Sequence, residues 1–271
     1  MAAFSYASNP NVMIVGVGLM GQYLARHVGA WLGAAKLVLV DGAEAINVAG
    51  ERTPLADFAR SISAAHPSLE VVAETVDVTS EDAVAALFAR HGDIRYLQHN
   101  AGISPRPLTA PEELGKQDIL GACEVNLWGA LNVLKQGIRA GAFAPRSHGV
   151  LLLSTSATVG SEGRASAAYE ASKGGLLNLL TLQARHFLEA HGLVLNGLAP
   201  SPLRGPMAAQ TAIGAGRLQA VEDSMPIGGL TDPSHIAAAT MYFWANECWC
   251  VGEVLTVDGG YTKHRPIYGA L

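Results

Sequence analysis

The sequence predicts a single α/β domain built on a doubly wound parallel sheet. Short runs of Val, Leu and Ile alternate along the chain with longer stretches that have helical spacing. These runs are continuously apolar, as expected of parallel strands that are covered by helices on both faces. The composition of the 271 residues shows no break or internal repeat, so residues 1–271 are expected to form one domain.

Seven strands are expected, each a short apolar run flanked by Gly, Pro, Asp, Asn or Ser. Because strands alternate with helical stretches, right-handed crossovers should order them into one parallel sheet. In chain order the runs cover residues 12–16, 36–41, 69–76, 94–99, 149–156, 193–199 and 253–258.

Helices are expected between the strands, and two of them have clear N-terminal signals. Ser80 is a candidate N-cap, and Glu81 and Asp82 follow it in the first turn, where carboxylates stabilise a helix. Asp232 and Pro233 provide the N-cap and N1 residues of a later helix. Six helices are expected. The first ends near residue 31, the second covers about 53–65, and the third begins at residue 80. The other three cover about 116–139, about 168–190, and 233 to about 246.

Two segments lack a clear pattern. Residues 201–229 are rich in Pro, Gly and Ala, and we expect them to form a lid over the site. Residues 263–271 form a tail after the last strand that could reach a neighbouring subunit or a site.

Composition excludes several classes of function. The formal net charge of −5 and the pI of about 6.0 do not favour nucleic acid or an anionic membrane as a partner. Neither a signal peptide nor a membrane-spanning run is expected, and the three cysteines fit a reducing, cytoplasmic location. Cysteine and histidine spacings suggest no metal site.

A glycine motif follows the first expected strand. Gly16, Gly18 and Gly21, with Leu19 and Met20 between them, form GxGxxG at the start of a helix. Such a turn lets the backbone approach a pyrophosphate at the helix N-terminus. The motif alone is weak evidence, because a tight turn without a ligand would have the same glycines.

Asp41 ends the second expected strand, twenty residues after Gly21. A carboxylate there accepts hydrogen bonds from the ribose hydroxyls of NAD and repels the extra phosphate of NADP. The residues that follow, GAEAI, contain no cation for a 2′-phosphate. The sequence therefore favours NAD, although an Asp in an ordinary turn is the alternative.

Polar or small residues also follow the third and fourth expected strands. Asp77 and Val78 follow one, and Asn100, Ala101 and Gly102 follow the other. Ligands of doubly wound sheets bind beyond these carboxyl ends. Taken separately, each pair fits turn chemistry better than a site.

The strongest local signal is Tyr169 followed by Lys173, which lie on one helix face. A nearby ammonium lowers the pKa of a phenol, which can then exchange a proton nearer neutral pH. An exposed pair on a helix face is the alternative. Ser156 lies thirteen residues before Tyr169 and could hold a carbonyl oxygen. Asn126 lies in a long helix, where a buried amide needs partners such as an ordered water.

Together these residues and their neighbours resemble the short-chain dehydrogenase/reductase family, in its single-domain NAD-dependent branch. The resemblance spans about residues 12–260 and is specific as a set. It is carried by Asp41 and by the segments HNAG, VNLWGALNVL, LLLSTSATVG, YEASK, LNGLAPSPL and GEVLTVDGG, in the family's order and spacing.

The resemblance implies a Rossmann-type fold and a catalytic tetrad of Asn126, Ser156, Tyr169 and Lys173. In this family the tyrosine is the general acid/base, the serine orients the substrate oxygen, the lysine binds the nicotinamide ribose and the asparagine holds a water. By the same resemblance, Asp77 and Val78 lie beside the adenine, Asn100 and Ala101 flank the ribose, and Pro200 and Leu203 border the nicotinamide.

Four departures from the family pattern affect these expectations. The glycine motif is one residue shorter than the usual GxxxGxG. His99 replaces the first Asn of NNAG, and Ser201 replaces the Gly of the Pro-Gly that follows the sixth strand. Ser154 competes with Ser156 for the catalytic role, and the spacing to Tyr169 favours Ser156.

The expected function is hydride transfer between NAD and a small, mainly apolar secondary alcohol or ketone, with Tyr169 handling the proton. A non-catalytic NAD-binding sensor or scaffold is the alternative, although such a protein need not keep all four tetrad residues. A sugar-nucleotide epimerase or dehydratase usually has a longer C-terminal domain. A homotetramer, or a homodimer, is expected by resemblance.

Overall fold

The main feature of the computed structural model is a seven-stranded parallel sheet in the order β5-β2-β1-β6-β7-β8-β9. The structure describes residues 4–104, 111–158, 167–203, 219, 222–223 and 225–263. All seven predicted strands are present, and the predicted fold class is confirmed. The strands are β1 (Asn11–Val15), β2 (Lys36–Asp41), β5 (Glu70–Thr75), β6 (Ile94–His99), β7 (Phe143–Leu152), β8 (Val194–Pro200) and β9 (Val254–Val257).

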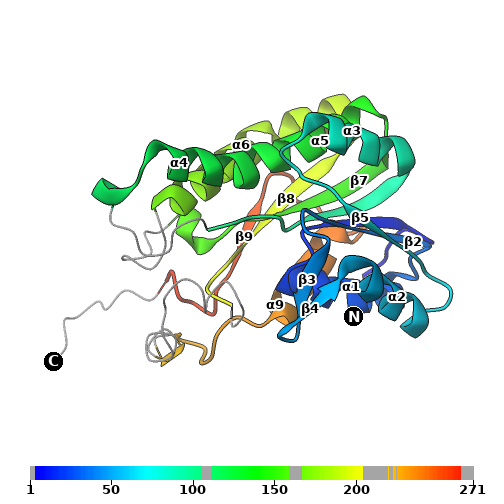
Figure 1. The fold of residues 1–271 in the computed structure, drawn as a ribbon, viewed down its shortest axis with the longest axis horizontal. Coiled ribbons are helices and arrows are strands. Elements are labelled where there is room, and N and C mark those ends of the chain that lie inside the picture. The colour runs from blue at the N-terminus through cyan, green and yellow to red at the C-terminus, as the bar shows by residue number, and fades with distance from the viewer. Residues whose placement is uncertain are drawn as a thin grey trace.

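Helices cover both faces of this sheet. In Figure 1, α1, α2 and α9 lie on one side of the strands, and α3 to α6 lie on the other. The helices are α1 (Leu19–Leu32), α2 (Leu55–Ala65), α3 (Glu81–Arg90), α4 (Lys116–Cys123), α5 (Gly129–Arg139), α6 (Ala167–His191) and α9 (Pro233–Trp244).

The two predicted N-caps are present. The Ser80 hydroxyl accepts a hydrogen bond from the Ala83 amide at the start of α3, at 3.2 Å. The Asp232 carboxylate accepts one from the Ser234 amide at the start of α9, at 2.8 Å, and Pro233 occupies N1.

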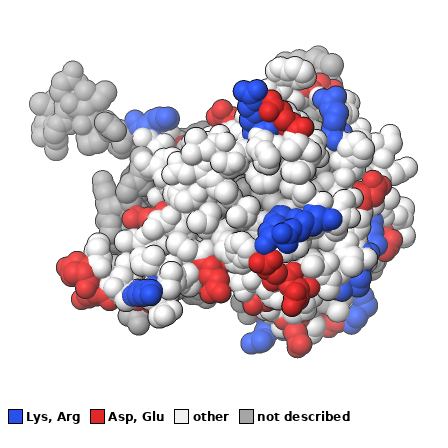
Figure 2. Space-filling model, turned by 90° about the horizontal axis from the view of Figure 1, so that it is seen from above, with Lys and Arg blue, Asp and Glu red and all other residues white. Residues whose placement is uncertain are grey.

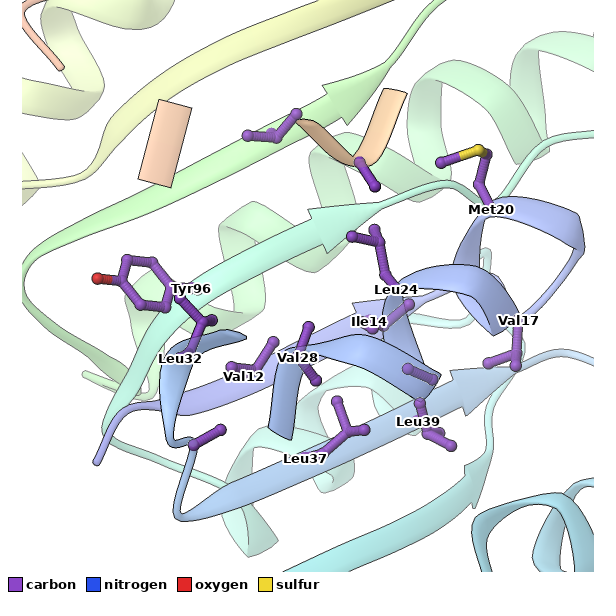
Figure 3. Close-up of a cluster of buried hydrophobic side chains, with 14 of the residues drawn as sticks. Val12, Ile14, Val17, Met20, Leu24, Val28, Leu32, Leu37, Leu39 and Tyr96 are labelled. Atoms are coloured by element: carbon purple, nitrogen blue, oxygen red, sulfur yellow. The ribbon is translucent and has the colours of Figure 1, made fainter. Parts of the chain in front are cut away.

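Successive residues of the central strands enter opposite cores. Val12 and Ile14 of β1 pack with α1, α2 and α9, whereas Met13 and Val15 pack with α3, α5 and α6. Figure 3 shows part of the first core, where Tyr96 of β6 also lies. This two-sided burial explains why the strand segments are continuously apolar in sequence.

The predicted long helix at 116–139 is interrupted by a π-helical turn, Glu124–Trp128, between α4 and α5. α4 packs against α6, and α5 packs against α3. Asn126 lies in the π-helical turn and is fully buried.

A small antiparallel hairpin between β2 and α2 was not predicted. It consists of β3 (Ala45–Val48) and β4 (Glu51–Pro54). Its two loop residues, Ala49 and Gly50, both have left-handed backbone, with φ of 52° and 95°. Asn-Gly is the usual sequence of such a turn, so Ala-Gly gave a weak signal and the predicted helix began too early, at residue 53.

The described residues set limits on other expectations. None of the described helices has the length and apolarity needed to cross a membrane. Cys123, Cys248 and Cys250 are free thiols. Most of the predicted lid at 201–229, and all of the predicted tail except Lys263, lie outside the described residues.

Candidate active site

The glycine motif forms the turn between β1 and α1. Gly16 has φ of +88°, and its amide donates to the Val40 carbonyl of β2 at 2.7 Å. A Cβ on Gly16 would lie 2.4 Å from the Ala101 amide nitrogen, and one on Gly21 would lie 2.3 Å from the Gly16 carbonyl oxygen. Glycine is therefore required at both positions by the close approach of backbone segments.

The N-terminus of α1 is open toward ligands. Gly18 is its N-cap residue, which provides no side-chain cap, and a Cβ on Gly18 would meet no atom within 4 Å. None of the first-turn residues is acidic. Free amides and open space at a helix N-terminus suit a phosphate group.

Asp41 bridges two backbone segments at the end of β2. Its carboxylate accepts hydrogen bonds from the amides of Val17 at 2.8 Å and Ala43 at 3.0 Å. The carboxylate therefore lies between the glycine turn and the chain that leads into the β3–β4 hairpin.

A cavity of about 690 Å³ lies at the carboxyl ends of β1, β2, β5 and β6. No Lys or Arg is among the described residues that line it. Most predicted cofactor-binding residues line this cavity: Gly16, Gly18, Leu19, Met20, Gly21, Asp41, Asp77, Val78, Asn100, Ala101, Gly102 and Leu203.

Two of these residues also have a structural role. The Asp77 carboxylate accepts hydrogen bonds from the amide and hydroxyl of Thr79, at 2.9 and 2.8 Å, in the turn before α3. The Val78 carbonyl accepts one from the Asn132 amide side chain at 2.9 Å. The turn chemistry considered at these positions is thus present beside the cavity.

Tyr169 and Lys173 lie one turn apart near the start of α6. The Lys173 ammonium nitrogen is 5.8 Å from the centre of the Tyr169 ring and donates to the Leu152 carbonyl at 2.8 Å. A Cβ on Gly102 would lie 3.3 Å from this nitrogen. Since Gly102 and Leu152 both line the cavity, Lys173 adjoins it.

Removal from water shifts both pKa values against the charged forms. Burial lowers the pKa of Lys173 to about 8. Burial raises the pKa of Tyr169, and a hydrogen bond with the Ser154 side chain partly opposes this rise. The net direction for Tyr169 is opposite to the one expected from sequence, because the sequence showed the ammonium but not the desolvation.

Ser154, rather than Ser156, is the hydroxyl beside Tyr169. The Ser154 side chain hydrogen bonds with Tyr169, and its oxygen also accepts from the Ser156 amide at 3.1 Å. β7 ends at Leu152, and Thr155–Ala157 form a 3-10 turn that Ser154 caps. The strand was expected to continue to residue 156, which placed Ser156 at its end.

Asn126 joins the loop after β6 to α6. Its side-chain oxygen accepts from the Ile103 amide at 2.7 Å, and its nitrogen donates to the Ile103 carbonyl at 2.9 Å and the Ser172 hydroxyl at 2.8 Å. Protein groups thus satisfy a side chain for which we considered an ordered water. A water held by Asn126 stays a prediction.

His99 lies at the end of β6, beside Leu151 of β7. It is 1% exposed, and its Nε2 has no hydrogen-bond partner among the described residues. Burial, together with the charge of Lys173, lowers the pKa of His99 to about 3, so the imidazole is neutral. Gln98 instead ties this strand end, by donating to the Asn100 side chain at 2.7 Å.

Two predicted cofactor residues, Pro200 and Leu203, lie at and just after the end of β8. Pro200 ends β8 and is buried without lining the cavity, whereas Leu203 lines it and forms a β-bridge with Thr231. Ser201, at the position of the family's glycine, hydrogen bonds through its hydroxyl to that of Thr231 at 2.5 Å.

The described part of the chain contains no cluster of His, Cys, Asp and Glu that could hold a metal.

Sequence reasoning missed several cavity residues. Most of the missed residues lie in the unpredicted hairpin and the chain leading to it, or are apolar residues without a motif. They are Val15, Val17, Gln22, Gly42, Ala43, Ala45, Ile46, Asn47, Val76, Ile103, Val125 and Leu152.

Comparisons with known proteins identify the family of this chain. A family model described as enoyl-(acyl carrier protein) reductase matches residues 30–262. Cis-4-hydroxycyclohexanecarboxylate dehydrogenase of Sinomonas cyclohexanicum is 30% identical over 257 residues, which cover 90% of this chain and 99% of that protein. The chain belongs to the short-chain dehydrogenase/reductase family.

A further relative supports this family assignment, and a solved structure shares the fold. Short-chain dehydrogenase reductase 3c of Arabidopsis thaliana is 29% identical over 197 residues, which cover 70% of this chain and 75% of that protein. The structure of a variant of actinorhodin polyketide ketoreductase with NADPH superposes with a TM-score of 0.78 at 23% identity and covers 96% of this chain and 100% of that one. The family model begins its match after the glycine turn, which is where this short-chain dehydrogenase/reductase departs from the family motif.

Proposed function

We propose that this oxidoreductase interconverts a small, mainly apolar secondary alcohol and its ketone, with NAD(H) as the cofactor and Tyr169 as the general acid/base. The observation that carries the proposal is the grouping of Tyr169 with Ser154 and with Lys173, which adjoins the cavity that Asp41 borders. The nicotinamide would supply or accept the hydride when bound.

The side chains divide the remaining work. Tyr169 would give a proton to the substrate oxygen in reduction and take it back in oxidation. The Ser154 hydroxyl would hold this oxygen, and the Lys173 ammonium would favour the phenolate and hold the nicotinamide ribose. Asn126, through Ile103 and Ser172, would keep the loop and α6 in place.

Two features support NAD over NADP. The Asp41 carboxylate borders the cavity, where it can accept hydrogen bonds from ribose hydroxyls and repel a 2′-phosphate. The described lining contains no Lys or Arg to neutralise that phosphate. The NADPH bound by the polyketide ketoreductase belongs to a protein that shares the fold at 23% identity.

The substrate class is supported by a relative and by the cavity. The Sinomonas relative is named for a secondary alcohol on a six-membered ring. The described cavity lining includes the apolar residues Ile103, Val125, Leu152 and Leu203. We therefore propose a cyclic secondary alcohol or ketone as the first class to test.

We also propose a cytoplasmic homotetramer, or a homodimer, assembled through the long helices. Figure 2 shows the molecule from the side that carries α3 to α6, where charged side chains are scattered and leave uncharged areas between them. Sparse charge suits a helix face that is buried between subunits.

The cofactor assignment is tested by replacing Asp41. Asp41→Ala should weaken NADH binding by about 10-fold, because hydrogen bonds to a charged group contribute about 1.5–3 kcal/mol. The NADPH dissociation constant should change less or fall, so the ratio of the NADPH constant to the NADH constant should decrease. Titration of the purified protein with each nucleotide, followed by nucleotide fluorescence, measures both constants.

Asp41→Asn is the matched control, because it keeps an oxygen for the Val17 or Ala43 amide while it removes the charge. Asp41→Asn should also decrease the ratio of the NADPH dissociation constant to the NADH dissociation constant. If the unmodified protein prefers NADPH, the NAD assignment is wrong. If it binds neither nucleotide, the proposed function loses its cofactor.

The two candidate hydroxyls can be separated by paired variants. Ser154→Ala should lower kcat about 100-fold with a cyclic alcohol substrate, because a hydrogen bond to the reacting oxygen is worth about 10²–10³ in rate. Ser156→Ala should change kcat by less than about 5-fold, because only its backbone amide contacts Ser154. The reverse ranking would return the role to Ser156.

A further inference from the structure

The β3–β4 hairpin and the glycine turn are held together by one side chain. Gln22, in the first turn of α1, donates from its side-chain nitrogen to the Val17 carbonyl at 3.0 Å and to the Asn47 carbonyl at 2.8 Å. Both hydrogens of this amide are therefore used, one on the glycine turn and one on the hairpin.

The tethered hairpin forms a wall of the cavity next to Asp41. Gly42 and Ala43 directly follow Asp41 and line the cavity, and Ala45, Ile46 and Asn47 continue this lining along β3. Ile46 is 7% exposed and packs into the core on the α1 side of the sheet, which anchors the strand.

Three other contacts fix the hairpin in shape. The Leu55 amide donates to the Glu44 carbonyl at 2.9 Å and closes its base. The Gly50 amide donates to the Asn47 side chain at 2.9 Å and closes its tip. The Ala43 amide donates to Asp41 itself at 3.0 Å. The hairpin is held at its base, tip and side. To make room for a nucleotide with an additional phosphate, the hairpin would have to move and lose at least one of these hydrogen bonds.

We infer that this hairpin, tethered by Gln22, is a second determinant of nucleotide choice that sterically excludes a 2′-phosphate. The inference rests on the proposed assignment of Asp41 to the adenosine ribose. A phosphate on the 2′ oxygen would project from the ribose beside Asp41 toward the wall that begins at Gly42. In this arrangement the Asp41 carboxylate repels the 2′-phosphate, and the hairpin occupies the space that the phosphate would need.

The hairpin carries one cation, Arg52, which lies opposite Asn47 in the register of β3 and β4. Arg52 is exposed and does not line the cavity. It therefore does not offer a phosphate-binding group at the wall.

The test is the substitution Gln22→Met, which keeps the side-chain length and removes both hydrogen-bond donors. Gln183→Met, on an exposed position of α6 away from the cavity, is the matched control. NADH and NADPH dissociation constants are measured by fluorescence titration for both variants and the unmodified protein. The ratio of the NADPH constant to the NADH constant should fall about 5-fold in Gln22→Met, since two hydrogen bonds no longer hold the wall, and should be unchanged in Gln183→Met.

An unchanged ratio in a folded Gln22→Met protein would overturn the inference and leave the role of Asp41 intact. If the unmodified protein prefers NADPH, and Arg52→Ala removes this preference, the hairpin binds the phosphate rather than excluding it.

A second measurement needs no variant. Hydrogen exchange of the amides in residues 45–54 should slow when NADH is bound to the unmodified protein, because the nucleotide would rest against the hairpin. If NADH binds without slowing this exchange, the hairpin is not part of the site, whatever the result for Gln22→Met.

Discussion

Replacing Tyr169 with Phe should lower kcat by about 1000-fold while NADH binding changes less than about twofold, since general acid/base catalysis contributes about 10²–10⁴ in rate. The substitution removes one oxygen, the one beside Ser154, and keeps the ring whose centre is 5.8 Å from the Lys173 nitrogen. Steady-state kinetics with a cyclic secondary alcohol, together with nucleotide titration, measure the two effects.

The pKa of Tyr169 determines how the rate of alcohol oxidation should depend on pH. Alcohol oxidation requires Tyr169 as a base, and burial raises its pKa, so the rate of the unmodified protein should increase with pH up to about 8, the range in which the Lys173 ammonium keeps its charge. In Tyr169→Phe this increase should disappear.

Tyr242→Phe is a suitable control, because Tyr242 lies in α9 and its hydroxyl contacts Cys250 rather than the cavity. Its kcat and pH profile should match those of the unmodified protein. Turnover by Tyr169→Phe at the unmodified rate would remove Tyr169 from the mechanism and would leave the binding assignments standing.

The second large effect is expected from Gly21→Ala. Alanine normally stabilises a helix interior by about 0.5–1 kcal/mol relative to glycine. At Gly21, however, the added Cβ would lie 2.3 Å from the Gly16 carbonyl oxygen and 3.3 Å from a side-chain carbon of Ile14. Backbone lies on one side and a packed strand on the other, so no flexible group can move aside. The clash therefore outweighs the gain in helix propensity, and the net effect on stability is unfavourable.

We therefore expect Gly21→Ala to reduce the free energy of unfolding by about 1–3 kcal/mol, the usual cost of overpacking a core. NADH affinity should fall at least about 10-fold, because α1 must move away from the turn that would hold the pyrophosphate. Urea denaturation and fluorescence titration measure the two quantities.

Gly18→Ala separates these effects. Gly18 has φ of −73°, which alanine adopts without strain, and a Cβ there would meet nothing within 4 Å. Its free energy of unfolding should stay within about 0.5 kcal/mol of the unmodified value. NADH binding should still weaken, because the methyl group would occupy the open space at the N-terminus of α1. If Gly21→Ala unfolds like Gly18→Ala, the close packing at Gly21 does not limit stability.

The sequence was sufficient to predict the sheet, because its strands are buried on both faces and stand out as apolar runs. The hairpin was missed for a local reason. Ala49 has a left-handed backbone that alanine rarely adopts, and this conformation is imposed by contacts such as the Gly50 amide on Asn47. Such contacts depend on the folded chain, so the sequence pattern does not reveal them.

Where motif and chain position agree, as for Asp41, Tyr169 and Lys173, the structure places the predicted residues at or beside the cavity, and their roles stay predictions. The candidate site was less predictable where the role of a residue depends on where a strand ends. Ser154 and Ser156 differ by two positions, and only the end of β7 at Leu152 decides which hydroxyl meets Tyr169. The direction of the Tyr169 pKa shift also depends on burial, which is a property of packing rather than of spacing.

The π-helical turn at Glu124–Trp128 has a consequence for how this chain tolerates changes in length. One residue corresponds to about 100° of rotation in an α-helix, so the extra residue of the π turn offsets the two halves of the segment by that angle. This offset lets α4 face α6 while α5 faces α3. A one-residue deletion there would restore a regular helix, turn one of the two halves off its neighbour and withdraw Asn126 from Ile103 and Ser172. The number of residues between α4 and α5 is therefore fixed by two packing partners at once.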